Sequence, residues 1–120
     1  MNTRLLKINA EIQKAVSEVI LYDLNNPKIY GIVSITKVDT TSDLSHCKIY
    51  VSIAEKEKQQ DIFNEIKKAS SFIRKNLSKK VILRKTPLLD FYLDNTVENA
   101  QLIDEMIEKI AQLRGNENND

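Results

Sequence analysis

The chain has 120 residues, of which 42% are hydrophobic and 29% charged, and its 18 basic and 17 acidic residues leave a formal net charge of +1. This length fits one domain with a sizeable core, and the mixture excludes a disordered or low-complexity chain. No apolar run exceeds four residues, no signal-like stretch opens the chain, and Cys47 is the only cysteine, so we expect no membrane span, no internal disulfide and a reducing cytoplasm.

The first half of the chain predicts a helix followed by a β-hairpin. Residues 3–24 carry apolar side chains at three- and four-residue steps, and Pro27 should end this helix at the preceding residues. Residues 32–53 predict two strands around a polar turn, with a bulge where the alternation slips between Ile35 and Val38. The core-facing residues of the second strand are expected to be Cys47, Ile49, Val51 and Ile53.

The second half predicts a bent helix, an extended segment and a last helix. Residues 59–79 have an apolar stripe that passes through Ala69, next to a serine pair that is a recognised place for a bend. Residues 82–93 look extended, and Pro87 suits the start of a strand. Asn95 can cap a last helix, whose apolar stripe is Ala100, Ile103, Ile107 and Ile110.

These elements predict an α+β fold in which helices cover one face of a small sheet. We expect a single domain over residues 1–114, followed by a disordered polar tail over residues 115–120. The sequence shows no internal repeat.

The net charge hides an uneven distribution. Residues 1–66 carry 8 basic and 9 acidic residues, residues 67–86 carry 8 basic and none acidic, and residues 87–120 carry 2 basic and 8 acidic. The basic block consists of Lys67, Lys68, Arg74, Lys75, Lys79, Lys80, Arg84 and Lys85. Like charges at this density repel one another, and a phosphate backbone would relieve the repulsion. The alternative is a solvated helix face that the acidic C-terminal segment neutralises.

The bend strengthens the case for a polyanionic partner. A helix that restarts at Ser70 and Ser71 presents free backbone N–H groups beside Arg74 and Lys75, and helix N-termini bind phosphate well. The alternative is an ordinary serine pair that faces solvent. Phe72 is expected in the core rather than as a stacking platform, which favours recognition of the nucleic-acid backbone or shape over reading of its sequence.

Catalysis has little support in the sequence. His46 and Cys47 are neighbours on a strand and should point to opposite faces, as an exposed histidine and a buried cysteine. Asp90 and Asp94 would lie roughly 13 Å apart along a strand, too far to act on one bond. No metal-ligand spacing and no glycine-rich phosphate loop occurs, so we expect no catalytic residue, metal or cofactor.

Several motifs, taken together, resemble one known family. Residues 83–94 fit the pattern Leu-Arg-x-x-Pro-x-Leu-x-Phe-x-x-Asp of the bacterial ribosome-binding factor A family. Residues 69–74 resemble its Ala-x-Gly-x-Ile-Arg motif, with Ser71 in place of the glycine. The segment from Asp43 to Ser52 resembles its second-strand motif, and Arg4-x-x-Lys7-Ile8 fits its opening. The resemblance covers roughly residues 3–113.

The resemblance implies a type II KH-like fold in which a helix–kink–helix replaces the GxxG loop of ordinary KH domains. It also implies a non-catalytic, cytoplasmic assembly factor that binds the small ribosomal subunit and its RNA and supports late rRNA maturation, including processing of the 5′ end. The residues expected to contact RNA are the eight members of the basic block together with Ser70 and Ser71. We expect a monomer with no membrane partner and no small-molecule substrate.

Two other functions compete with this one. The first is a protein-interaction module that docks its basic helix on an acidic partner or on the acidic C-terminal segment of another copy. The second is a small enzyme, which ranks last because the sequence offers no reactive group.

Overall fold

The computed structural model describes residues 3–94. In chain order its elements are α1 (Thr3–Glu18), the π-helical turn η1 (Val19–Asp23), β1 (Val33–Thr40), β2 (His46–Ile53), the 3₁₀ turn η2 (Lys56–Lys58), α2 (Gln59–Lys68), α3 (Ser70–Lys80) and β3 (Leu88–Leu93). This is the α+β, type II KH-like arrangement that the sequence predicts. The last predicted helix, the domain boundary at residue 114 and the polar tail lie outside the described residues.

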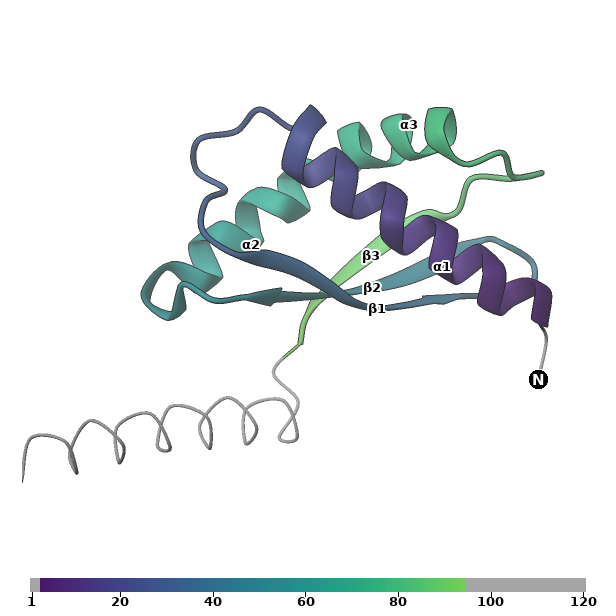
Figure 1. Ribbon diagram of the computed structural model, residues 1–120, viewed down its shortest axis with the longest axis horizontal. Helices are drawn as coiled ribbons and strands as arrows, with labels where there is room; N and C mark the ends of the chain where they lie inside the picture. Colours follow the sequence, from purple (N-terminus) through teal and green to yellow (C-terminus); the bar gives the residue numbers. More distant parts are fainter. Residues whose placement is uncertain (1–2, 95–120) are drawn as a thin grey trace, which may run out of the picture.

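The three strands form one mixed sheet in the order β1-β2-β3 (Figure 1). The hairpin pairs β1 with β2 antiparallel, and β3 joins the other edge of β2 in parallel, with Cys47 opposite Leu89. A parallel neighbour can be reached only through a crossover, and α2 and α3 form it. The register shifts between Ile35 and Lys37, which confirms the predicted bulge.

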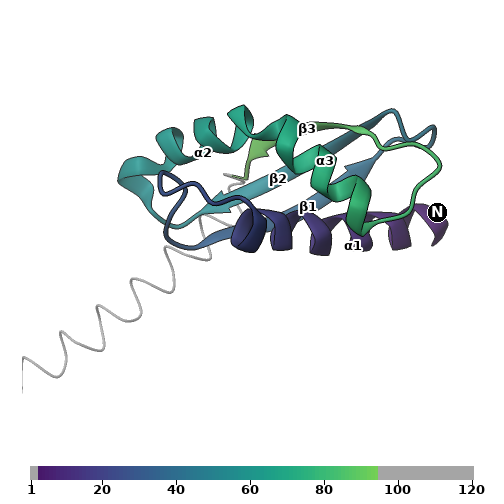
Figure 2. The ribbon, with the colours of Figure 1, turned by 90° about the horizontal axis from the view of Figure 1, so that it is seen from above.

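The helices lie on the same side of the sheet and enclose the core with it (Figures 1 and 2). The predicted inward residues of β2 are all buried, since Cys47, Ile49 and Val51 are 0% exposed and Ile53 is 3% exposed. The fully buried side chains that the helices add are Ile12, Val16, Val19, Ile62, Ile66, Ile73 and Leu77. The apolar stripes predicted for the first two helices are therefore confirmed, and Ala69 lies partly buried against the same core.

The predicted bend is present and lies at Ala69. This residue separates α2 from α3 with φ −87° and ψ 7°, while its N–H still donates to Glu65 O and Ile66 O at 3.1 Å. Leu44 is the one non-glycine residue of the described range with a positive φ, so neither the break nor position 71 needs the backbone freedom of glycine. Ser71 in place of the family's glycine is therefore compatible with the observed kink.

The structure corrects three details. The first helix ends as the wide turn η1 instead of continuing regularly to residue 24. In the predicted extended segment 82–93, strand pairing covers only Leu88–Leu93. Phe72 is expected in the core but is 42% exposed, because it lies about 100° around the helix from the buried stripe residue Ile73. None of the helices among residues 3–94 is long and apolar enough to cross a membrane.

The central strand provides a direct test of the core. Ile49 is fully buried in the middle of β2, so Ile49→Ala should lower the free energy of unfolding by about 2–5 kcal/mol through lost burial and a residual cavity. Urea denaturation measures this change. Tyr22→Ala, at a side chain that is 80% exposed, should change the stability by less than about 0.5 kcal/mol. Equal stability of the two variants would contradict the assignment of this core.

Candidate nucleic-acid interface

Two adjoining hollows follow the edge strand β3 below the junction of α2 and α3. The larger has a volume of about 530 Å³ and is lined by Ser70, Ser71, Arg74, Lys75, Ser78, Lys85, Thr86, Leu88 and Leu89. The smaller, of about 260 Å³, is lined by Lys67, Ser70, Leu89, Asp90, Phe91 and Tyr92. Since the two share Ser70 and Leu89, we treat them as one surface and call it the basic groove.

The basic groove depends on one arginine that ties α3 to the segment before β3. Arg74 donates from Nε to the carbonyl oxygen of Pro87 at 3.0 Å and from Nη2 to that of Thr86 at 2.7 Å. Pro87 is buried and has no backbone N–H, so its carbonyl oxygen is the one backbone group with which it can form a hydrogen bond. The predicted RNA-binding residue Arg74 thus has a structural role, and its remaining guanidinium donors stay at the groove.

The N-terminus of α3 opens into the same groove. An α-helix leaves its first N–H groups without acceptors inside the helix, and α3 begins at Ser70 and Ser71. At the junction, Lys67 O at the end of α2 also accepts a backbone N–H. No side chain caps this end. Lys75 lies on the same helix and Lys85 on the opposite wall, in the segment between α3 and β3. The arrangement offers backbone donors, hydroxyl groups and cations to one anionic ligand.

The structure brings together six of the ten predicted site residues. These are Lys67, Ser70, Ser71, Arg74, Lys75 and Lys85. Lys67 also places its Nζ 5.4 Å from the ring centroid of Phe63, which keeps the charged end of its side chain close to α2. Lys79 and Arg84 are exposed but line neither hollow of the groove.

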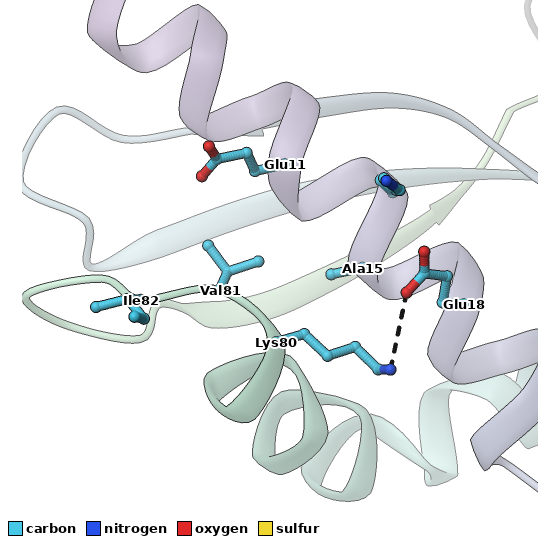
Figure 3. A pocket seen from close by; sticks show the side chains of 7 residues that line it. Glu11, Ala15, Glu18, Lys80, Val81 and Ile82 are labelled. Carbon is cyan, nitrogen blue, oxygen red and sulfur yellow. Dashed lines mark ion pairs between the residues drawn. The ribbon is translucent and has the colours of Figure 1, made fainter.

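Lys80 faces away from the groove, towards the end of α1. Its Nζ lies 3.7 Å from Glu18 Oε2 and 3.3 Å from Asp23 Oδ2 (Figure 3, where the Glu18 pair is drawn). These ion pairs tie the last turn of α3 to α1 and η1, so Lys80 is satisfied within the chain. Lys68 also leaves the groove, because its Nζ pairs with Glu65 Oε1 at 3.5 Å on the other side of α2.

Internal neutralisation of the block is therefore partial. Among residues 3–94, no carboxylate lies within ion-pair distance of Lys75, Lys79 or Lys85, although Lys85 is near enough to Asp43 for its charge to help lower the pKa of that carboxyl. The acidic C-terminal segment that could cover these lysines lies outside the described residues.

The turn between β1 and β2 fixes the start of β3, which forms one side of the groove. Leu88 donates its N–H to Ser45 O at 3.0 Å, which joins the start of β3 to this turn. The Oδ1 of Asp43 accepts from Ser45 Oγ at 2.7 Å, from Thr41 Oγ1 at 2.8 Å and from Ser45 N at 3.0 Å. The hydroxyl of Ser45, followed by that of Thr41 and the Ser45 amide, holds the pKa of Asp43 well below its ordinary value.

The sequence did not single out Ser78 or Thr86, which also line the groove. Both are common polar residues whose role depends on the parallel pairing of β3 with β2, and no local pattern signals such pairing. Asp90 was considered only as a catalytic partner of Asp94. The structure instead places its Oδ2 3.2 Å from His46 Nδ1, across two neighbouring strands.

The described residues offer little for covalent chemistry. Cys47 is fully buried, and burial raises the pKa of its thiol, so it stays protonated and inaccessible. His46 is exposed as predicted and lies on the opposite face. Among residues 3–94, no three His, Cys, Asp or Glu side chains come together as metal ligands. The chemistry that the groove supports is the binding of an anion.

Arg74 provides the first test of the groove. Arg74→Met keeps most of the side-chain volume but removes both hydrogen bonds, so we expect a loss of about 1.5–3 kcal/mol in the free energy of unfolding. Arg74→Lys should restore little, because one ammonium cannot reproduce the two-pronged contact. Hydrogen exchange should also accelerate at Leu88 and Leu89 in both variants. Unchanged exchange there would show that Arg74 does not hold this segment.

Asp43 provides a second test, through pH. A carboxyl whose pKa is lowered on folding stabilises the protein above the pKa of the unfolded chain, about 4, and this contribution is lost as the pH falls towards the folded value. Asp43→Asn should therefore flatten the decline of stability below about pH 4, as measured by urea denaturation at several pH values. Asp39→Asn, at an exposed neighbour, serves as the control. Parallel pH profiles for wild type and Asp43→Asn would contradict the proposed hydrogen bonds.

The sequence comparisons identify the family. Residues 4–107 match the family model described as ribosome-binding factor A. The chain is 38% identical over 113 residues to the ribosome-binding factor A of Clostridium botulinum strain Loch Maree, which covers 93% of this chain and 94% of the relative. It is 40% identical over 115 residues to that of Clostridium acetobutylicum, which covers 95% and 93%.

Solved structures agree with this match. The crystal structure of ribosome-binding factor A from Thermus thermophilus superposes with a TM-score of 0.68 at 20% identity, over 77% of this chain and 98% of that one. The solution structure of a putative ribosome binding factor A from Thermotoga maritima gives 0.67 at 27% identity, over 79% and 91%. By the family model and by the Clostridium relatives, the chain belongs to the ribosome-binding factor A family.

Proposed function

We propose that this protein binds the small ribosomal subunit through its RNA and supports late rRNA maturation, including processing of the 5′ end. The observation that carries the proposal is the basic groove, where Lys75 and Lys85 line one hollow together with the first residues of α3. Membership of a ribosome-binding family supports it. A Thermus thermophilus ribosome binding factor A has been fitted into the cryo-EM map of a 30S complex, and its homology model superposes on this chain with a TM-score of 0.57 at 24% identity.

The contacts expected in the groove are contacts to phosphate. Lysine and arginine side chains that neutralise phosphates release counterions, and backbone N–H groups at a helix start can bind one phosphate directly. Lys67, Arg74, Lys75 and Lys85 supply the cations, and Ser70 and Ser71 supply the hydroxyl groups. Lys79 and Arg84, exposed outside the groove, can extend the contact along an RNA backbone.

This groove favours recognition of RNA shape over reading of bases. Phe72 is exposed but does not line the groove. The ring of Tyr92, at the groove's far end, already stacks on Tyr50 with centroids 5.5 Å apart. Base reading needs free aromatic faces or donor–acceptor pairs at base edges, and the basic groove has mainly cations and hydroxyls.

The proposed function also includes how the protein acts on the RNA. The protein would act without catalysis, cofactor or small-molecule substrate, as a monomeric domain over residues 1–114 that holds RNA in a folded arrangement. Its site of action would be the cytoplasm, because the small subunit is assembled there in bacteria.

Charge removal in the groove tests the proposal. Four phosphate contacts predict a log–log salt slope of about −3 for binding to free small subunits. Lys75→Gln combined with Lys85→Gln should weaken binding roughly 10- to 50-fold at about 0.1 M salt and make the slope shallower by roughly 1.5. Co-sedimentation with free small subunits and with mature ribosomes, at two salt concentrations, measures both effects.

A matched control removes the same charge elsewhere. Lys14→Gln combined with Lys48→Gln changes two exposed lysines outside the groove and should leave the affinity close to that of wild type. Equal losses in the two double variants would show that only net charge matters. A salt-sensitive homodimer without affinity for small subunits would favour the protein-interaction module instead.

A further inference from the structure

A third hollow, of about 400 Å³, lies on the other side of α2, against the loop that joins η1 to β1. Figures 1 and 2 both show this loop beside α2. The hollow is lined by residues of α2 from Asp61 to Lys68, whereas Lys67 is the residue of α2 that lines the basic groove. Six of the residues around it carry the argument, and they are Lys28, Tyr30, Lys58, Asp61, Glu65 and Lys68. No sequence motif points to this place, although Lys68 belongs to the basic block.

A structured loop presents Tyr30 to this hollow. Lys28 donates its N–H to Asn26 Oδ1 at 2.9 Å, and Ile29 donates its own to Asn26 O at 3.0 Å, which forms a tight turn. Ile29 packs against the core, and Gly31 turns the chain with φ +77°. Tyr30, between these two anchors, keeps 46% of its side chain exposed. An aromatic ring held in this way loses little conformational entropy when a ligand stacks on it.

Three lysines from three segments line the same hollow as the ring. Lys28 comes from the loop, Lys58 from η2 and Lys68 from the end of α2. Glu65 holds two parts of this arrangement together, since its Oε2 accepts from Asn26 Nδ2 at 3.3 Å and its Oε1 pairs with Lys68 at 3.5 Å. Among these partners, the Asn26 amide contributes most to holding the pKa of Glu65 below its ordinary value, so the carboxylate stays charged.

The charges indicate which part of a ligand fits where. Carboxylates accept hydrogen bonds and repel phosphate, so Asp61 and Glu65 favour a base with N–H groups inside the hollow. The lysines around it favour phosphates outside. An aromatic ring, three lysines and two carboxylates that line one hollow match one unpaired nucleotide with its flanking phosphates.

We propose that this hollow binds a single unpaired nucleotide of an RNA strand, with its base on the Tyr30 ring and its flanking phosphates on Lys28 and Lys58. The inference rests on the proposed function insofar as the ligand is RNA, but it concerns a different surface and a different mode of recognition. The basic groove would hold folded RNA by its backbone, while the Tyr30 hollow would hold an unpaired residue of the same molecule.

A five-nucleotide RNA of alternating adenosine and guanosine tests this directly with the full chain. The protein has four tyrosines and no tryptophan, so a base stacked on Tyr30 should quench its tyrosine fluorescence. Tyr30→Ala should weaken binding of this RNA roughly 5- to 100-fold, because stacking is lost. Tyr30→Phe should bind nearly as well as wild type yet lose the quenching, a combination that a merely structural role would not produce.

The controls separate this inference from the proposed function. Tyr22→Ala removes an exposed ring that does not line the hollow and should bind like wild type. Lys28→Gln combined with Lys58→Gln should make the salt slope for the short RNA shallower by roughly 1.4. Equal affinity of Tyr30→Ala and wild type, quenching that persists in Tyr30→Phe, or no binding of the short RNA would overturn the inference. Loss of small-subunit binding in the Lys75 and Lys85 variant would still support the proposed function in each of these cases.

Discussion

The parallel pairing of β3 with β2 is the constraint on which the rest of this structure depends. It requires a crossover that leaves the end of β2, returns along one face of the sheet and starts β3 beside Cys47. One straight helix over the residues of α2 and α3 would be roughly 33 Å long, well beyond the roughly 20 Å of the six-residue strand β3. The break at Ala69 lets the crossover change direction, so that both halves keep their apolar stripes on the core.

The break also creates the binding surface. It gives α3 an N-terminus that no side chain caps, and the hydrogen bonds of Arg74 to Thr86 and Pro87 hold the opposite wall in place. The turn of the hairpin adds a third support through the bond from Leu88 to Ser45. The groove therefore forms where the crossover, the edge strand and the hairpin turn meet, and its shape depends on all three.

Sequence patterns predicted local features well and spatial neighbours poorly. The alternation around Ile49, the slip after Ile35 and the weak point at Ala69 are all encoded within a few residues, and the structure has them where they were expected. The partners of Arg74 and Lys80 lie far away in the chain, so periodicity could not show that one bonds to backbone and the other to α1. The prediction that Phe72 is buried was wrong for a related reason, since hydrophobicity alone does not say on which face of the helix a residue lies.

The distribution of charge follows from the same packing. The eight basic residues are close together in the sequence, which predicts one basic surface, yet in the fold they make different contacts. Lys80 stabilises the contact of α3 with α1, Lys68 joins Glu65 beside the Tyr30 hollow, and Arg74 supports a wall. The cations left for an external polyanion at the groove, Lys75 and Lys85 foremost, are those that no carboxylate of residues 3–94 pairs with. A nearly neutral chain can thus present a cationic groove, because the carboxylates of residues 3–94 that pair with its lysines stabilise the fold, and Asp90 is the one acidic residue of that range that lines the groove.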